Sequence, residues 1–164
     1  MSFLKITIIA CLVLAFSFPA LAETLSGRVV HVADGDTITV LDAGNKQHKI
    51  RLSGIDAPER KQAYGNVSKK HLADLVAGKP VTVEWSKHDK YLRIVGKVLQ
   101  NGQDVCLEQI KAGMAWHYKY YVKDQPPEDR VSYAAAEDEA RAAHRGLWKD
   151  ANPVPPWEWR HMGK

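Results

Sequence analysis

The sequence predicts an α+β protein built on a five-stranded OB-fold β-barrel with about three helices. Three strand-like segments, rich in β-branched residues and separated by tight turns, occupy residues 24–55. A helical segment follows at 63–77, and two further alternating segments lie at 80–86 and 92–100. Five short strands with a helix after the third are typical of small barrels of the OB type, which bind nucleic acids or sugars on one face. The fold alone does not decide between these functions.

The first two strands form a hairpin. Residues 24–33 stop at Asp34-Gly35, and residues 36–42 alternate between polar and apolar side chains. Because Asp-Gly is a strong hairpin signal, we interpret Asp34 as a turn residue. Asp36, in contrast, opens a strand, so backbone pairing fixes its position.

The third strand is expected over residues 47–55. Ile50 and Leu52 lie on one face of it, and Arg51 lies on the other. If the apolar pair faces the barrel interior, Arg51 faces outward, toward the acidic residues on either side of it in the sequence.

Helices are expected at three places. Residues 63–77 carry an apolar stripe and end at Gly78; Asp104 is the N-cap of a short helix that ends at Gly113; residues 129–144 form a third helix. Residues 114–127 mix aromatic and lysine side chains and are expected to form a loop or short strand.

The chain divides into three parts. Residues 1–22 have one charge, Lys5, then an apolar run and a small-x-small end, which is typical of a signal peptide cleaved after Ala22. An uncleaved anchor is the alternative, although the apolar run is short for a bilayer. Residues 23–150 form one domain, and residues 151–164, with several prolines and two tryptophans, are expected to be an extended tail. We expect a secreted or periplasmic protein, monomeric and without stable membrane insertion after cleavage.

The charge and the cysteines set broad limits. The whole chain has a formal charge of +4, which permits a polyanionic partner but does not require one. Cleavage after Ala22 leaves one cysteine, Cys106, so no internal disulfide forms; its apolar neighbours indicate a core position. The seven histidines show no metal-ligand spacing, and His117 and His144 are expected to be surface or capping residues.

Acidic and basic residues then suggest phosphodiester chemistry. Asp36 and Asp56 come from separate strands, and carboxylate oxygens are the ligands that hard cations prefer. Arg51 and Arg93 could bind one phosphate and stabilise the charge of a five-coordinate transition state. Glu59 could act as the general base on water.

These residues resemble the staphylococcal (thermonuclease-type) nuclease family. The resemblance runs from about residue 25 to Trp148. It rests on the following segments in order: Asp34-Gly35-Asp36-Thr37, Arg51-Leu52, Ile55-Asp56-Ala57-Pro58-Glu59, Tyr64-Gly65, Asp89-Lys90-Tyr91-Leu92-Arg93 and Arg145-Gly146-Leu147-Trp148.

The resemblance implies a Ca²⁺-dependent nuclease that hydrolyses DNA and RNA to 3′-phosphate products. Its implied site residues are three for metal, three for catalysis and six for substrate. The metal ligands are Asp36, Asp56 and the carbonyl of Ala57; the catalytic residues are Arg51, Glu59 and Arg93; the substrate-binding residues are Thr37, which also lies beside the metal, Lys90, Tyr91, Tyr118, Tyr120 and Tyr121.

Leu92 departs from the family pattern, which usually has Gly or Gln there. The position favours a backbone conformation that glycine adopts readily, so the sequence leaves the effect of Leu92 on the aim of Arg93 undecided. The sequence also does not assign which tyrosine stacks on a base. Two alternatives stay open: a catalytically weak OB-fold nucleic-acid-binding module, and a carbohydrate-binding barrel that would use exposed aromatics such as Trp157 and Trp159. The presence of all five charged site residues favours the nuclease.

Overall fold

The computed structural model describes residues 23–162, so the expected signal peptide at 1–22 lies outside the described residues. Within that range no helix is long and apolar enough to cross a membrane.

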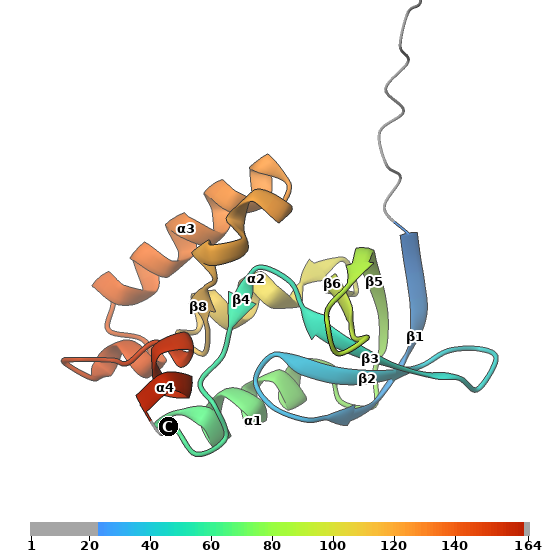
Figure 1. The fold of residues 1–164 in the computed structure, drawn as a ribbon, viewed down its shortest axis with the longest axis horizontal. Helices are drawn as coiled ribbons and strands as arrows, with labels where there is room; N and C mark the ends of the chain where they lie inside the picture. Colours follow the sequence, from blue (N-terminus) through green and yellow to red (C-terminus); the bar gives the residue numbers. More distant parts are fainter. Residues whose placement is uncertain (1–22, 163–164) are drawn as a thin grey trace, which may run out of the picture.

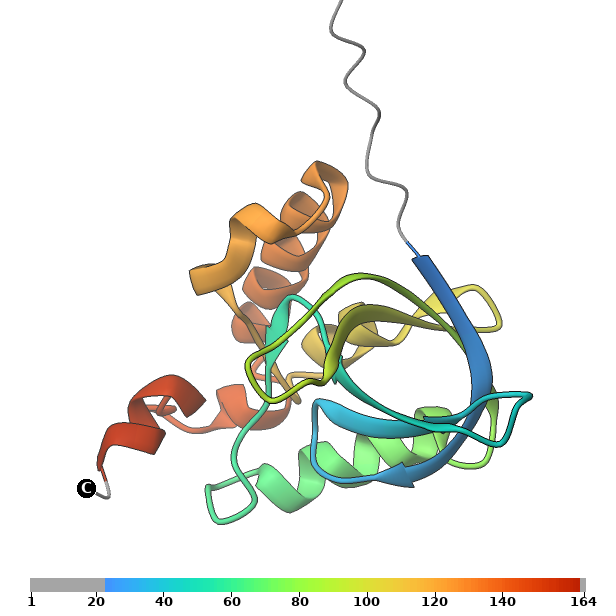
Figure 2. The ribbon, with the colours of Figure 1, turned by 45° about the vertical axis from the view of Figure 1, so that its right-hand side comes forward.

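Five strands close into a barrel, as predicted (Figures 1 and 2). The barrel strands are β1 (Glu23–Val32), β2 (Thr37–Leu41), β3 (Gln47–Leu52), β5 (Pro80–His88) and β6 (Ile94–Gln100). Three two-residue strands accompany them: β4 (Ile55–Asp56), β7 (Gln103–Asp104) and β8 (Trp116–His117). The main sheet runs β3-β2-β1-β5-β6-β7, and a parallel pairing of β3 with β6 closes it. This closure brings the ends of β2, β3 and β6 together, where the site lies.

Apolar side chains at every second position of the strands fill the interior of the barrel. Ile38, Val40, Ile50 and Leu52 are at most 1% exposed, and they alternate with side chains on the outer face. Arg51 is therefore directed outward between two core residues. The local alternation of the sequence thus determines which face of β3 carries charge.

The third strand is shorter than expected. It ends at Leu52, Gly54 adopts a φ of +73°, and β4 pairs with β8 in a separate two-stranded sheet. The expectation of one strand over 47–55 was wrong because Gly54 turns the chain, and a Cβ there would lie 2.2 Å from the side chain of Gln125. The turn carries Asp56 off the barrel wall.

Four α-helices and two 3₁₀ segments surround the barrel. They are α1 (Gly65–Val76), α2 (Val105–Lys111), η1 (Lys119–Asp124), α3 (Pro127–Ala142), η2 (Gly146–Lys149) and α4 (Pro156–Met162). Asp104 caps α2, as predicted, by accepting a hydrogen bond from the Leu107 N–H at 3.0 Å. Cys106 is fully buried, which confirms its place in the core.

The C-terminal segment is not extended throughout. Pro156 begins the seven-residue helix α4, which lies beside the segment between β4 and α1 (Figure 1). Proline suits the first turn of a helix because no intrahelical N–H is needed there. The expectation of an extended tail over 151–164 was therefore wrong for residues 156–162.

The expectation that His117 is a surface or capping residue was also wrong. His117 is 2% exposed, and its Nε2 lies 2.9 Å from Gln125 Oε1. The pairing of β8 with β4 buries it, and this pairing joins segments about 60 residues apart. His144 is exposed just beyond α3, as expected.

Candidate active site

Two buried carboxylates lie side by side at one end of the barrel. Asp36 directly precedes β2 and is 7% exposed, and Asp56 ends β4 and is 1% exposed. The Leu52 N–H donates to the Asp36 carbonyl at 2.8 Å, and the Ala57 N–H donates to Asp36 Oδ2 at 2.8 Å. Backbone before and after β4 thus holds the two aspartates together.

Arg51 connects the two carboxylates. Its Nη2 lies 3.1 Å from Asp36 Oδ2 and 3.0 Å from Asp56 Oδ1. Its Nη1 donates to the carbonyls of Leu52 at 2.8 Å and Ile55 at 2.9 Å. Four contacts from two terminal nitrogens fix the guanidinium, so Arg51 lies where strand alternation predicted, facing the acidic pair.

Burial dominates the electrostatics of this cluster. It raises the pKa of Asp36 above the usual range despite the charge of Arg51, and it raises the pKa of Asp56 despite Arg160 and Arg51. Burial also opposes the charge of Arg51, but the two aspartates outweigh it and raise the pKa of Arg51. Because burial destabilises the ionised form of both carboxylates, an added positive charge beside them would stabilise that form.

Arg93 reaches the site from the turn between β5 and β6. Its Nε donates to Asp89 Oδ2 at 2.7 Å, and Asp89 Oδ1 accepts the N–H groups of Tyr91 and Arg93 at 2.8 and 3.0 Å. Arg93 Nη1 lies 3.5 Å from Thr37 Oγ1, which donates to Asp36 Oδ1 at 3.1 Å. Thr37 therefore links Arg93 to the acidic pair.

Leu92 is part of this turn. It adopts a left-handed φ of +61°, and its N–H donates to the Asp89 carbonyl at 3.0 Å. The side chain is 83% exposed. Leucine here adopts the left-handed conformation that glycine favours, at a cost in strain.

Glu59 lies in the turn between β4 and α1, after the buried Pro58. Its N–H donates to Gln62 Oε1 at 3.0 Å, and its carbonyl accepts the Gln62 N–H at 2.8 Å. The side chain is 41% exposed and accepts a hydrogen bond from Arg160 Nη1 at 2.8 Å. Since the same guanidinium contacts Asp56, the Glu59 carboxylate lies next to the acidic pair and opens to solvent.

An aromatic group borders the site. The Tyr118 N–H donates to the Gly54 carbonyl at 2.8 Å, which places Tyr118 beside the start of β4. Its ring stacks on Tyr120, with centroids 6.2 Å apart and planes at 21°, and Tyr121 meets both rings edge-on. Tyr120 is the most open ring, at 82% exposure. Three of the predicted tyrosines, Tyr118, Tyr120 and Tyr121, are thus contiguous.

Lys90 and Tyr91 lie in the turn between β5 and β6. The Lys90 ammonium is 5.0 Å from the Tyr91 ring centroid, and the Arg93 guanidinium carbon is 5.5 Å from it. Tyr91 is exposed and shields Arg93 on one side. These two candidates flank the arginine rather than the aspartates.

Arg160 is a site contact that the sequence did not reveal. Its Nη2 donates to Asp56 Oδ2 at 2.8 Å, and its Nη1 lies 3.3 Å from Asp56 Oδ1. The two residues are 104 positions apart. In the sequence, the one local hint of this contact is that Trp157 and Arg160 are three positions apart, as on one face of a helix. The prolines before Trp157 favoured the expectation of an extended tail.

The sequence also did not reveal the role of Gln109 in supporting the site. Gln109 is fully buried in α2, and its Nε2 donates to the Gly35 carbonyl at 2.7 Å, within the turn that positions Asp36. Gly35 also packs closely on α1, since a Cβ there would lie 1.9 Å from Ser68 Oγ. A single glutamine in an apolar helix face gave no sign of this contact.

Several known proteins are similar to this chain over most of its length. Residues 49–150 match the family model described as "Staphylococcal nuclease homologue". An "Uncharacterized endonuclease" of Escherichia coli is 48% identical over 89% of this chain and 92% of its own length. A protein of the same description from Haemophilus influenzae is 45% identical over 84% of this chain and 74% of its own length. The "Micrococcal nuclease" of Shigella flexneri is 41% identical over 94% and 91%.

Proposed function

Since the chain belongs to the staphylococcal nuclease family of nucleic-acid-hydrolysing enzymes, we propose that it is an exported, Ca²⁺-dependent, sugar-nonspecific nuclease. It would cleave phosphodiester bonds of DNA and RNA and leave 3′-phosphate products. The observation that carries the proposal is the cluster in which Arg51 joins Asp36 to Asp56, with Glu59 and Arg93 at the same end of the barrel. Export rests on the pattern of residues 1–22, and a monomer remains our expectation.

The donor chemistry suits a hard cation. Asp36 and Asp56 would hold Ca²⁺, with the carbonyl of Ala57 as a further ligand. Within residues 23–162 no group of three or more His, Cys, Asp or Glu side chains is arranged to hold a metal ion. The protein would therefore supply few ligands and leave positions for water and substrate. When bound, Ca²⁺ supplies positive charge that polarises the scissile phosphate.

Glu59 would take a proton from the attacking water, because its carboxylate is open to solvent and adjacent to Asp56. The oxygen of that water forms the new bond to phosphorus, and the bond from phosphorus to the 5′-oxygen breaks. The departing 5′-oxygen takes up a proton and leaves as a hydroxyl, so the phosphate stays on the 3′ side.

The arginines would stabilise the phosphate during attack. Arg93 uses Nε and Nη1 in its described contacts, so Nη2 is open to a phosphate oxygen. Arg51 uses both terminal nitrogens on carboxylates and carbonyls, and Nε is its remaining donor. Donors fixed before the reaction stabilise the growing charge more than mobile ones. Tyr118, Tyr120 and Tyr121 would stack on bases without reading sequence.

The test is to incubate the purified protein with single-stranded DNA, double-stranded DNA and RNA, with Ca²⁺ or with a Ca²⁺ chelator. We expect cleavage of all three only with Ca²⁺. End-group analysis should find 3′-phosphate and 5′-hydroxyl termini. Tight binding of DNA without cleavage in Ca²⁺ would instead support the nucleic-acid-binding module, and cleavage in the chelator would refute the metal requirement.

A further inference from the structure

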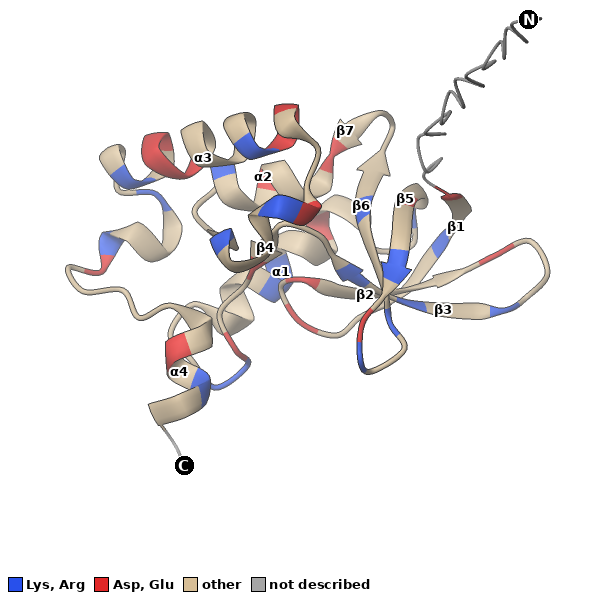
Figure 3. Ribbon diagram, turned by 45° about the horizontal axis from the view of Figure 1, so that its top comes forward, with Lys and Arg blue, Asp and Glu red and all other residues tan. Residues whose placement is uncertain are grey.

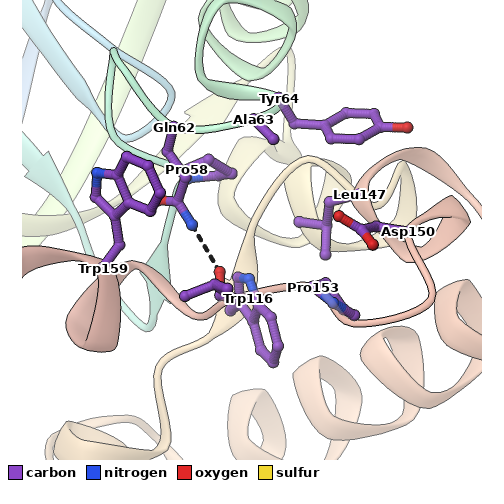
Figure 4. A pocket seen from close by; sticks show the side chains of 10 residues that line it. Pro58, Gln62, Ala63, Tyr64, Trp116, Leu147, Asp150, Pro153 and Trp159 are labelled. Atoms are coloured by element: carbon purple, nitrogen blue, oxygen red, sulfur yellow. Dashed lines mark hydrogen bonds between the residues drawn. The ribbon is translucent and has the colours of Figure 1, made fainter. Parts of the chain in front are cut away.

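The C-terminal helix α4 is held against the site by aromatic packing. Trp157 stacks on Tyr118, with centroids 5.5 Å apart and planes at 21°, and meets Trp116 edge-on at 5.4 Å. The Val154 carbonyl, just before the helix, accepts the Gln62 side-chain N–H at 2.6 Å (Figure 4). A helix of seven residues is not stable alone, so these contacts determine its presence.

A cavity of about 200 Å³ lies between the C-terminal segment and the segment before α1. Its lining includes Pro58, Gln62, Tyr64, Trp116, Pro153 and Trp159 (Figure 4). Trp159 is the one residue of α4 among the lining residues, so this side of the helix borders open space and not packed side chains.

Arg160 lies three positions after Trp157, on the adjoining turn of the same helix. Basic and acidic positions both occur along the ribbon of α4 and of the nearby segment between β4 and α1 (Figure 3). There Arg160 Nη2 lies 2.8 Å from Asp56 Oδ2, and Arg160 Nη1 lies 2.8 Å from Glu59 Oε1. One guanidinium thus contacts both carboxylates to which the proposed function assigns metal binding and proton transfer.

The two arginines at Asp56 differ in how firmly they are held. Arg51 is 14% exposed and also bonds two backbone carbonyls. Arg160 is 39% exposed, and its described contacts are all to carboxylate side chains. Arg51 is therefore a fixed part of the site, whereas Arg160 is an exchangeable partner.

Both oxygens of Asp56 are occupied by these arginines. Oδ1 is 3.0 Å from Arg51 Nη2 and 3.3 Å from Arg160 Nη1, and Oδ2 is 2.8 Å from Arg160 Nη2. A divalent cation on Asp56 needs the same lone pairs, and a water on Glu59 needs the oxygen that Arg160 occupies. Arg51 contacts only Oδ1, so it is the Arg160 guanidinium on Oδ2 that a cation bound there would have to displace.

We propose that α4 is an autoinhibitory element whose Arg160 occupies the cation position at Asp56 and Glu59 and must leave before a divalent cation binds. This inference rests on the proposed function, since it assumes that Asp56 is a Ca²⁺ ligand. The competition lowers the Ca²⁺ affinity of the resting protein and couples activity to release of the C-terminal helix.

The test compares Ca²⁺ binding by calorimetry in the wild type, Arg160→Gln and Arg28→Gln. Arg28 is exposed on β1, at the end of the barrel away from Asp36, so its variant loses the same charge without touching the site. Arg160→Gln should bind Ca²⁺ about tenfold more tightly than Arg28→Gln. Trp157→Ala, which loosens α4 without removing a charge, should shift Ca²⁺ affinity in the same direction.

Hydrogen exchange gives a readout independent of cleavage. In the wild type, Ca²⁺ should speed exchange of the amides of residues 156–162, because release of Arg160 loosens α4. Equal or weaker Ca²⁺ binding by Arg160→Gln, relative to Arg28→Gln, would overturn the inference while leaving the nuclease proposal intact. So would a loss of more than about tenfold in kcat at saturating Ca²⁺, which would place Arg160 on the reacting phosphate. If no variant binds Ca²⁺ and none cleaves DNA, the proposed function itself fails.

Discussion

Leu92 offers a prediction whose size follows from the structure. Its φ of +61° is a left-handed conformation, which costs an L-residue about 1–2 kcal/mol. Glycine avoids that strain but loses roughly 0.5–1 kcal/mol more conformational entropy on folding. Because the leucine side chain is 83% exposed, little burial is lost on its removal. Leu92→Gly should therefore raise the free energy of unfolding by about 0.5–1 kcal/mol.

Thermal unfolding followed by circular dichroism measures this change. For a chain of this size the gain corresponds to a rise in Tm of about 1–4 °C. Leu92→Ala is the matched control, since it removes most of the side chain and keeps the Cβ that causes the strain. Its Tm should stay close to that of the wild type.

Nuclease activity should not change in Leu92→Gly. Asp89 holds Arg93 by its side-chain Nε and by its backbone N–H, and neither contact involves the side chain at position 92. If Leu92→Gly proves less stable than Leu92→Ala, the strain argument is refuted. If it is stable but loses activity, Leu92 itself sets the aim of Arg93.

Other changes test the site and its support. Glu59→Gln should lower kcat about 10²–10⁴-fold and Arg93→Ala about 10²–10³-fold, with an unchanged circular dichroism spectrum; full activity in either would remove the assigned role. Tyr120→Ala should weaken binding of single-stranded DNA about tenfold in a fluorescence anisotropy titration, while Tyr120→Phe should bind normally, because stacking needs only the ring. Gln109→Met should lower the free energy of unfolding in urea by about 1–3 kcal/mol, because the Gly35 carbonyl loses its 2.7 Å bond; an unchanged midpoint would contradict this.

The strands and helices were largely predictable from the sequence. Alternation identified the interior of the barrel, and the N-cap at Asp104 was found by residue type alone. Such signals are local, because the apolar and polar faces of a strand or helix can be recognised from a few consecutive residues. The break at Gly54 and the burial of His117 were missed, since both depend on β4 pairing with β8.

The sequence by itself was enough to predict the members of the candidate site, because Asp36, Arg51, Asp56, Glu59 and Arg93 all come from short segments with recognisable order. It also determined that Arg51 faces away from the barrel interior, because β-strand geometry allows no other placement between two core residues.

The tertiary structure alone decided which charges meet. The parallel pairing of β3 with β6 set Arg93 near Thr37, and the packing of Trp157 on Tyr118 brought Arg160 to Asp56 across 104 positions of chain. Local patterns do not encode such contacts, because they arise from the packing of separate elements against one another. For that reason the C-terminal segment, which looked like an extended tail in sequence, contains in the fold a helix that places the Arg160 guanidinium against Asp56 and Glu59.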